Sequence, residues 1–289
     1  LRGVGEWGYA ALIEADGHTL LFDTGARPET VLNNAAELGI DLSTVETVML
    51  THNHWDHTGG LTTLRRELQS RNDKAVQTAH VGAGIFLPRR LDAEAAGKMP
   101  PIPPELLIDV RAVRKAYESL GGRFIVHDEP YELHPGIWIT GPIPRMHPEK
   151  NWTPFMRIEK DGELVEDTIP EDQALVINTP QGLVIVSGCG HAGIVNTMEY
   201  ARRITGHESV HAVVGGLHLI SAREKQIEWT GNKMREFGVQ HVQGAHCTGI
   251  NPVAGLREAG HLSRQTTAVG AVGSTFTLSE GIRPGILTR

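Results

Sequence analysis

Hydrophobic and polar positions near the start of the chain fall into two short runs, a pattern that predicts a β-hairpin. Residues 9–14 and 19–23 are rich in aliphatic side chains, and residues 15–18 between them are typical of a tight turn. Residues 28–38 change to helical spacing, with apolar side chains on one face, and Gly39 is a suitable end for such a helix. We therefore predict two strands followed by a helix.

The rest of the chain continues this alternation of strands and helices. Apolar positions recur every second residue in a strand and about every 3.6 residues in a helix. The predicted strands cover 45–50, 123–127, 131–133, 136–140, 174–178, 183–187, 210–214 and 239–243, and the predicted helices cover 61–68, 111–120, 193–204 and 221–237. Residues 278–289 have little pattern.

The chain reads as one domain, residues 1–289, because no linker rich in Pro, Gly or Ser divides it and no repeat of fixed period appears. Each half has strands followed by helices, which predicts an α/β fold of two mixed β-sheets packed together, with helices covering the outside. Residues 86–104 are less regular and include a proline-rich run at 100–104. We therefore predict a lid-like insertion at about 86–118.

Charge and hydropathy narrow the classes of partner. The formal net charge is −7 and no window carries a run of like charges, so we expect no nucleic-acid or anionic-membrane surface. No apolar stretch approaches the roughly 18 to 20 residues that cross a bilayer. We therefore expect a small-molecule substrate, no nucleic acid and no membrane, with a homo-oligomer left open.

The two cysteines, Cys189 and Cys247, exclude a disulfide framework and leave either one bridge or two free thiols, of which we expect free thiols. The chain begins at Leu1, which is compatible with a cleaved leader or an omitted first segment. The compartment therefore stays unknown, with a cytoplasmic location favoured.

The most informative segment is 51–60, which follows one predicted strand and precedes a predicted helix. It supplies imidazole and carboxylate ligands, of the kind that zinc, manganese or iron binds: His52, His54, Asp56 and His57. In an extended segment residues two apart share a face, so His52, His54 and Asp56 would converge, and His57 could turn toward a second ion. The alternative is a polar or histidine-rich surface loop, but the flanking strand and helix favour a ligand loop.

Further candidate ligands end other predicted strands or lie on the loops that leave them: Asp23, His147, Cys189, His191, His218 and His246. Loops held by a rigid sheet are where catalytic groups concentrate. Because a single zinc ion needs only about four ligands, these additional side chains favour two ions.

The histidine motif at 52–57, with Asp23 at an earlier strand end and the later strand-end sites, resembles the metallo-β-lactamase superfamily over nearly the whole chain. More narrowly, segments 188–196, 215–219 and 246–249 are similar to the branch named for dihydropterin ribofuranosylaminobenzene phosphate synthase. The resemblance implies a four-layer αββα sandwich of two mixed β-sheets flanked by helices, the metallo-β-lactamase fold.

The resemblance assigns metal ligands position by position: His52, His54 and His147 to the first ion, and Asp56, His57 and His246 to the second. Asp23 matches a buried carboxylate that orients a ligand, with a turn or capping role as the alternative. After the strand that ends at Gly188, most superfamily hydrolases have a bridging Asp, whereas this chain has Cys189, with His191 two residues on. We favour His191 as the ligand, with Cys189 as its rival, and expect weaker binding of the second ion.

Three further side chains are candidates for substrate contact: His218, Trp55 and Trp7. His218 alternatively packs against the site, and Trp55, which would point away from the ligand face, alternatively packs in the core. Trp7 would flank the pocket if the N-terminal segment overhangs it. His147 is alternatively an ordinary loop histidine. The remaining histidines are treated as surface or core residues: His18, His80, His127, His134, His207, His211, His241 and His261.

This set of residues predicts a metal-dependent hydrolase. Two divalent ions, zinc first with manganese or iron as alternatives, would lie about 3.5 to 4 Å apart and lower the pKa of a shared hydroxide toward roughly 7. Asp56 would hold one ion and hydrogen-bond this hydroxide, and the other ion would stabilise charge on the substrate oxygen. A small ester, lactone or phosphoester suits this chemistry.

Two other functions remain as hypotheses. The branch name implies a transferase that joins a pterin-type compound to a ribosyl phosphate. The third hypothesis is a non-hydrolytic di-iron redox or binding protein. Neither a flavin domain nor a carboxylate-rich ligand set, which would favour this hypothesis, is apparent in the sequence. The residues that line the pocket determine which substrate is accepted, and the sequence does not predict the shape that they form.

Overall fold

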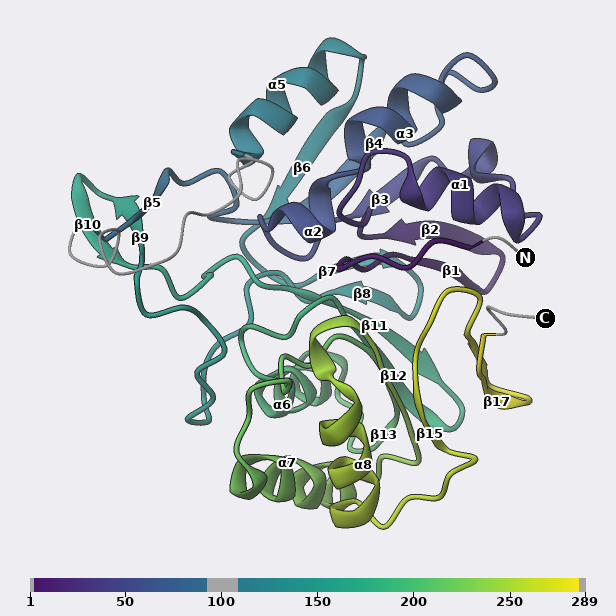
Figure 1. Cartoon of the computed structure of the whole chain (residues 1–289), viewed down its shortest axis with the longest axis vertical. Coiled ribbons are helices and arrows are strands. Elements are labelled where there is room, and N and C mark those ends of the chain that lie inside the picture. The colour runs from purple at the N-terminus through teal and green to yellow at the C-terminus, as the bar shows by residue number, and fades with distance from the viewer. Residues whose placement is uncertain (1–2, 93–108, 286–289) are drawn as a thin grey trace.

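A computed structural model describes residues 3–92 and 109–285 of the chain. Two large β-sheets pack face to face, and helices cover the outer face of each sheet, so that the molecule has four layers (Figure 1). This arrangement confirms the predicted αββα sandwich.

The first sheet comes from the N-terminal half of the chain. Its strands lie in the order β1-β2-β3-β4-β6, with the bounds β1 Ala11–Ala15, β2 His18–Phe22, β3 Thr47–Met49, β4 Thr78–Gly82 and β6 Arg123–His127. Strands β1 and β2 form the predicted antiparallel hairpin, and the other neighbours pair in parallel. The outer helices of this half are α1 (Thr30–Glu37), α3 (Leu61–Leu68) and α5 (Val110–Ser119) (Figure 1).

The second sheet has seven strands in the order β15-β14-β13-β12-β11-β8-β7. Their bounds are β7 Tyr131–His134, β8 Ile137–Ile139, β11 Ala174–Thr179, β12 Gly182–Ser187, β13 Val210–Gly215, β14 His241–Gly244 and β15 Thr267–Val269. Strands β12 to β15 are parallel to one another, and the neighbours from β7 to β12 are antiparallel. Helices α6 (Ile194–Thr205), α7 (Glu224–Glu236) and α8 (Ile250–Ala259) cover its outer face.

Three buried hydrophobic clusters fill the spaces between the four layers. Leu21 packs with Leu64 and Tyr117 under the first helical layer, whereas its neighbour Phe22 packs with Leu175 between the two sheets. A third cluster lies between the second sheet and its own helices. Successive side chains of a strand point to opposite faces, so a strand buried on both faces needs consecutive apolar residues. This need explains the unbroken apolar runs in the sequence.

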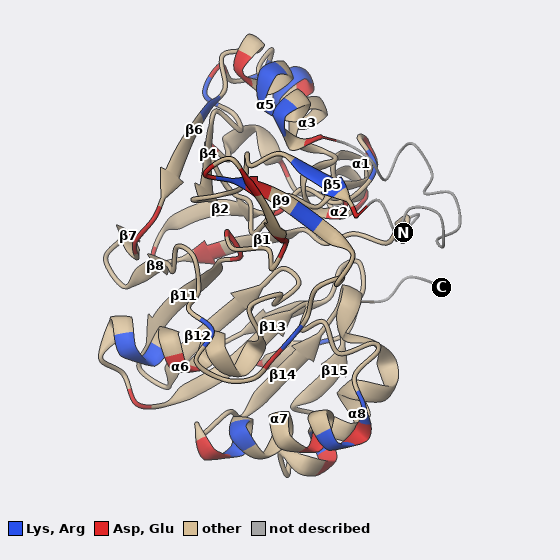
Figure 2. Cartoon of the chain, turned by 90° about the vertical axis from the view of Figure 1, so that its left-hand side faces the viewer, with Lys and Arg blue, Asp and Glu red and all other residues tan. Residues whose placement is uncertain are grey.

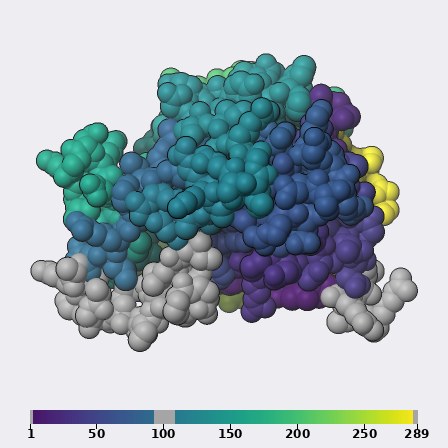
Figure 3. All heavy atoms as spheres, turned by 90° about the horizontal axis from the view of Figure 1, so that it is seen from above, coloured from purple at the N-terminus to yellow at the C-terminus, as the bar shows by residue number. Residues whose placement is uncertain are grey.

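Two smaller sheets extend the sandwich. Strands β5 (Arg89–Leu91), β9 (Met156–Lys160) and β10 (Glu163–Glu166) pair side by side, and β9 and β10 project from the body of the molecule (Figures 1 and 3). Strands β16 (Thr275–Thr277) and β17 (Gly281–Arg283) form a short hairpin. Residues 278–289 show little pattern in the sequence although they include β17, because a three-residue strand is too short to show a period.

The predicted lid-like insertion at about 86–118 is described only in part. Residues 93–108 lie outside the described residues, so the lid stays a prediction, as does the single-domain organisation of residues 1–289. Helix α5, at the end of this range, contributes Val110 and Tyr117 to the buried core. The Tyr117 hydroxyl donates a hydrogen bond to the Val76 carbonyl oxygen at 2.8 Å. This end of the range therefore belongs to the outer helical layer.

Many of the charged residues belong to the outer helices, and others belong to strands such as β5 and β9 (Figure 2). Within the described ranges, no helix is both long enough and apolar enough to span a bilayer. The predicted ligands other than His147 lie elsewhere, in the segments that follow β2, β3, β12, β13 and β14, and His147 lies in the segment between β8 and β9.

The packing between the sheets generates a stability prediction. We expect Leu175→Ala to lower the free energy of unfolding by about 2 to 5 kcal/mol, because it removes a fully buried side chain and leaves a cavity between the sheets. Leu164→Ala on β10, where the side chain is 45% exposed, should change it by less than about 0.5 kcal/mol. Denaturant unfolding of both variants checks this, and equal effects would contradict the assigned core.

Candidate metal centre

The ligand loop begins where β3 ends and is attached tightly to the loop after β2. The Thr24 and Gly60 backbone N–H groups donate to the carbonyl oxygens of His57 and Thr24, at 2.7 and 3.1 Å. A Cβ atom at Gly60 would lie 2.3 Å from the Thr24 carbonyl oxygen, so only glycine allows this approach. The Gly59-Gly60 pair therefore brings the histidine motif against the loop that carries Asp23.

The expectation that residues 52–56 form one extended segment is wrong. His54 is extended, but a single helical turn, α2 (Trp55–Thr58), begins directly after it. The backbone N–H groups of His57 and Thr58 both donate to the His54 carbonyl oxygen, at 3.1 and 3.2 Å. Asp56 therefore reaches the site from a helical turn, and the simple alternation of faces does not apply to it.

The structure nevertheless gathers most of the predicted ligands. Within each of four groups, the potential ligand atoms all lie within 4.8 Å of one another: His52, His54 and Asp56; His52, Cys189 and His191; His57, Cys189 and His246; and Cys189, His218 and Cys247. These residues come from the loops after β3, β12, β13 and β14. Loops from both sheets therefore meet at one place.

Hydrogen bonds at Nδ1 set the direction of three of these imidazole rings. His57 Nδ1 lies 2.7 Å from Asp23 Oδ2, and His52 Nδ1 lies 2.9 Å from Thr51 Oγ1. His191 Nδ1 is hydrogen-bonded to the Asn151 carbonyl oxygen. With Nδ1 engaged, the Nε2 atom of each ring is left for the centre of the cluster, as is usual for histidines that bind metal.

Several ring nitrogens of the cluster have no hydrogen-bond partner among residues 3–92 and 109–285. His52 Nε2, His191 Nε2 and His246 Nδ1 are buried without a hydrogen bond, whereas His246 Nε2 lies 3.3 Å from Asp56 Oδ2. An unsatisfied buried polar atom costs about 1 to 3 kcal/mol. Neutral imidazole nitrogen and carboxylate oxygen are the donors that zinc prefers. The residues therefore fit a metal centre on their chemistry as well as on their position.

Asp23 is the carboxylate that connects the ligands from behind. It is fully buried, and it accepts hydrogen bonds from the Thr51 backbone N–H at 2.8 Å and from the Thr51 hydroxyl at 2.9 Å, besides His57 Nδ1. Because the Thr51 hydroxyl donates to Asp23, its oxygen is free to accept from His52 Nδ1. Asp23 thus orients His57 directly and His52 through Thr51.

The electrostatics of the cluster favour the neutral form of His52 and His54 but not of His57. Burial lowers the pKa of His54 to about 4, and burial together with neighbouring histidines lowers the pKa of His52 well below its usual value. Burial alone would also lower the pKa of His57, but the Asp23 and Asp56 carboxylates raise it to about 9. The first two rings are therefore in the neutral form that a metal requires.

Both rivals for the position after β12 lie in the cluster. The ring centroids of His191 lie 4.6 Å from His52 and 4.7 Å from His54, and Cys189 Sγ lies 3.1 Å from His57 Nε2. The backbone N–H of Ala192 donates to the buried Asp172 carboxylate at 2.7 Å, which holds this loop in place. Both Cys189 and His191 therefore lie within the cluster, and their positions alone do not decide which of them is the ligand.

His147 is placed apart from the four groups. Its ring packs against Trp229 of α7, with centroids 5.9 Å apart. The backbone N–H groups of Met146 and His147 donate to Asn196 Oδ1 at 2.7 and 2.6 Å, and the Glu149 carboxylate accepts from the Asn196 backbone N–H at 2.9 Å. These bonds tie the loop to the start of α6. His191 therefore lies beside His52 and His54, whereas His147 contacts Trp229, and the ligand role of His147 stays a prediction.

The candidate substrate residues occupy different positions around the cluster. The ring of Trp7, which is 50% exposed, lies 5.1 Å from the ring of His246. His218 lies 4.5 Å from the ring of His191 and has a buried, unpaired Nδ1. Trp55 is partly buried at the start of α2, and its role stays a prediction.

Sequence reasoning missed several residues that shape the site. Thr51 carries the hydrogen bond from Asp23 to His52, and its place directly before the motif was the available signal. Asn151 holds His191, and its side chain also donates to the Gly190 carbonyl oxygen at 2.9 Å. No local pattern indicates a contact between residues 40 positions apart in sequence.

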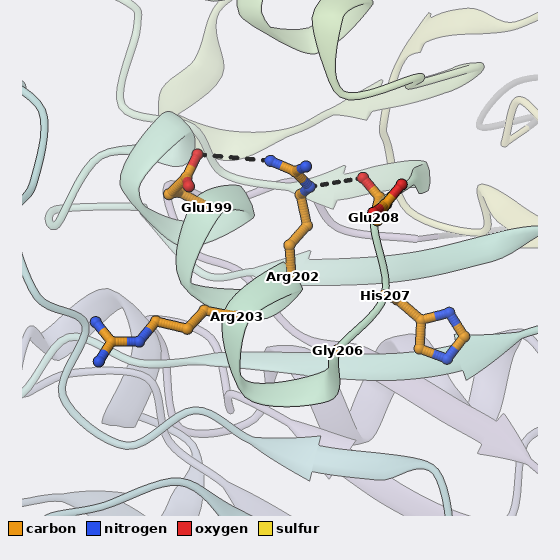
Figure 4. Close-up of a pocket in the computed structure, with 6 residues that line it drawn as sticks. All are labelled: Glu199, Arg202, Arg203, Gly206, His207 and Glu208. Atoms are coloured by element: carbon orange, nitrogen blue, oxygen red, sulfur yellow. Dashed lines mark hydrogen bonds and ion pairs between the residues drawn. The ribbon is translucent and has the colours of Figure 1, made fainter.

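A surface hollow at the end of α6 is not part of this centre (Figure 4). It is lined by Glu199, Arg202, Arg203, Gly206, His207 and Glu208. Arg202 Nη1 lies 3.6 Å from Glu199, and its Nε donates to the Glu208 carbonyl oxygen at 2.6 Å. No predicted metal or substrate residue lines the hollow, so we assign no chemistry to it.

Comparisons with known proteins agree with this fold. The sequence profile described as Metallo-beta-lactamase superfamily matches residues 8–203. The 7,8-dihydropterin-6-methyl-4-(beta-D-ribofuranosyl)-aminobenzene-5'-phosphate synthase of Methanocaldococcus jannaschii is 32% identical over 253 residues, which cover 84% of this chain and 81% of that protein. An uncharacterized protein of the same organism is 27% identical over 253 residues, 87% of each chain.

A solved structure gives the same result. The crystal structure of Tm1679, described as a metal-dependent hydrolase of the beta-lactamase superfamily, matches with a TM-score of 0.68 and 25% identity, covering 88% of this chain and 86% of that one. The superfamily profile spans more than half of the present chain, and the synthase is similar over most of it. This chain therefore belongs to the metallo-β-lactamase superfamily.

Proposed function

We propose that this protein is a metal-dependent hydrolase of a small ester, lactone or phosphoester. The observation that carries the proposal is the meeting of five imidazoles and one carboxylate from loops of both sheets: His52, His54, His57, His191, His246 and Asp56. Two of the buried rings, those of His52 and His191, are hydrogen-bonded at Nδ1 and have no partner at Nε2 within the described part of the chain. A structural core gains nothing from such unpaired nitrogens, whereas a metal centre requires them.

The proposed ligands divide into two sets. His52, His54 and His191 would hold one divalent ion, and Asp56, His57 and His246 would hold the other. Zinc is the first choice for this mixture of nitrogen and oxygen donors, with manganese or iron as alternatives. When bound, such ions lower the pKa of water toward roughly 7 and polarise a substrate oxygen, which supplies a nucleophile without an attacking serine.

The chain's own residues would orient the reaction. Asp56 lies 3.3 Å from His246 Nε2 and 3.9 Å from His57 Nε2 in its own set. A carboxylate oxygen of Asp56 also lies within 4.8 Å of the potential ligand atoms of His52 and His54 in the other set. Interactions with these histidines lower the pKa of Asp56, despite a burial effect that would raise it. The ionised carboxylate can therefore accept a hydrogen bond from the attacking water and direct its lone pair toward the scissile carbonyl or phosphoryl group.

Trp7 would bind the part of the substrate that does not react. Its segment is held to the loop after β2, because the Glu6 carboxylate accepts hydrogen bonds from the Ala26 and Arg27 backbone N–H groups at 2.8 and 3.0 Å. The exposed indole next to His246 offers a flat apolar surface beside the ligands. We propose that a ring or acyl group of the substrate packs there, and that His218 donates or accepts a hydrogen bond.

One comparison favours a second function, a transferase that joins a pterin-type compound to a ribosyl phosphate. The synthase from Methanocaldococcus jannaschii is similar over 84% of this chain, although only 32% of the aligned residues are identical. A hydrolase consumes a single substrate and water, whereas a transferase forms product only when both substrates are present. Product analysis with single and paired substrates distinguishes the two.

The hydrolase proposal predicts a dependence on metal. Removing metal with a chelator should abolish hydrolysis across a panel of lactones, phosphoesters and carboxylic esters, and adding zinc should restore it, because the protein supplies no other nucleophile in the proposal. Full activity of the metal-free protein would contradict it. If metal analysis finds iron and the protein hydrolyses none of these substrates, the result would favour the hypothesis of a redox or binding protein.

Removal of one imidazole tests the ligand set itself. We expect His52→Ala to lower the metal content measured by mass spectrometry and to reduce turnover at least about 100-fold, since an ion would lose a ligand held at Nδ1. His207→Ala is the matched control, because His207 is exposed and far from the ligand loop in sequence. Equal metal content in the two variants would sink the assignment.

The role of Asp23 generates a third test. Asp23→Asn should weaken metal binding by about 10- to 100-fold, because the amide loses the charge and one of the two acceptor oxygens that orient His57 and Thr51. Asparagine tolerates the positive φ of 56° at this position, so the fold should survive. Titration against a chromogenic chelator gives the affinity. Asp73→Asn, at an exposed position, should leave it unchanged.

A further inference from the structure

We infer that Cys189 is a thiolate ligand shared by both ion positions, in addition to His191 and not in place of it. The inference rests on the metal centre of the proposed function and extends it by one residue. Both residues are then ligands. His191 completes one ligand set, and the sulfur of Cys189 connects the two sets.

The position of the sulfur atom carries the inference. Among the described residues, Cys189 belongs to a group with His52 and His191 and also to a group with His57 and His246, and the potential ligand atoms of each group lie within 4.8 Å of one another. These histidines belong to the two different proposed sets. Cys189 Sγ is therefore close to the ligand nitrogens of both, and it faces His57 Nε2 directly at 3.1 Å.

The backbone around Cys189 is shaped to place the thiol there. A Cβ atom at Gly188 would lie 2.3 Å from Thr51 Oγ1 and 2.5 Å from Asp23 Oδ2. Only a glycine lets the chain pass this close to the buried carboxylate. Because Cys189 follows at once, the contact that packs the β12 loop onto Asp23 also brings the sulfur to the imidazoles. The placement is a property of the loop and not of a flexible side chain.

A purely structural role for Cys189 explains its surroundings less well than a ligand role does. A buried cysteine commonly packs as a small apolar residue, but the neighbours of this thiol are polar ring nitrogens, not a hydrophobic cluster. A disulfide with Cys247 is the other alternative. The two sulfur atoms lie 3.3 Å apart, whereas a disulfide bond is about 2.05 Å long, so both thiols are free.

Cys247 provides a contrast within the same site. It is as buried as Cys189, its thiol donates toward Cys189 Sγ, and its sulfur accepts from the His218 backbone N–H at 3.3 Å. Its only group of potential ligands, within the described part of the chain, is the one with Cys189 and His218. The structure therefore assigns Cys247 a supporting hydrogen bond and leaves the shared ligand role to Cys189.

Coordination of the thiol is balanced by the loss of one proton. On metal binding the sulfur–hydrogen bond of Cys189 would break, the proton would pass to solvent, and the sulfur lone pair would bind the ion, with no change in oxidation state. A thiolate donor favours soft or borderline ions such as zinc, cobalt(II) and cadmium over magnesium or calcium. The carboxylate that most relatives have here, by the resemblance noted above, is a harder donor.

The test uses cobalt(II) as a spectroscopic probe in the full chain. Cobalt-loaded wild-type protein should show a near-ultraviolet thiolate-to-cobalt charge-transfer band, and Cys247→Ser should retain it. Cys189→Ser should lose the band and bind the more weakly held ion about 10- to 100-fold less tightly, as measured by competition with a chelator and by metal analysis. Cys189→Asp should also lose the band but keep both ions, because a carboxylate can again be shared.

The outcomes separate this inference from the proposed function. Two bound ions in the wild-type protein without a charge-transfer band would overturn the role of Cys189 and leave the hydrolase proposal standing. Loss of the band in Cys247→Ser, with Cys189→Ser unaffected, would move the thiolate to Cys247 and overturn it too. A wild-type protein that binds no ion would refute both. Circular dichroism of each variant, with Cys189→Asp as the second substitution, shows whether a loss reflects misfolding.

Discussion

The hydrogen bonds of the buried Asp23 carboxylate are the interaction on which the rest of the site depends. Asp23 orients His57 directly and His52 through the Thr51 hydroxyl, so the free nitrogens of these rings face the same space. The carboxylate lies under the point where the loops after β2, β3 and β12 meet, and Gly188 allows the third loop to approach it. Assembly of the ligands therefore requires both sheets to be packed together.

Much of the fold could be predicted because its determinants are local. The helix at 61–68 has an apolar face that repeats with the helical period, and the structure has α3 at Leu61–Leu68. The hairpins at 9–23 and 174–187 follow from apolar runs around short polar turns. The short strand β17 and helix α2 could not be predicted, because three or four residues show no period and their conformation is set by contacts with distant segments.

The candidate site was predictable to the extent that its residues end strands. His52, His54, His191 and His246 each follow an apolar run, and the structure brings them together. His147 follows a similar run but is held beside α7 by bonds between its loop and Asn196, which is about 50 residues away in sequence. Such a contact leaves no periodic trace in the sequence. For the same reason the support that Asn151 gives to His191 had to come from the three-dimensional structure.

The most direct test of the account is the location of metal in a crystal of zinc-loaded protein, measured by anomalous diffraction at the zinc edge. We expect the anomalous peaks among the inward nitrogens of His52, His54, His57, His191 and His246, with Asp56 and Cys189 in contact. Anomalous peaks only at histidines on the surface, with no density among these buried rings in an enzymatically active protein, would contradict the proposed metal centre.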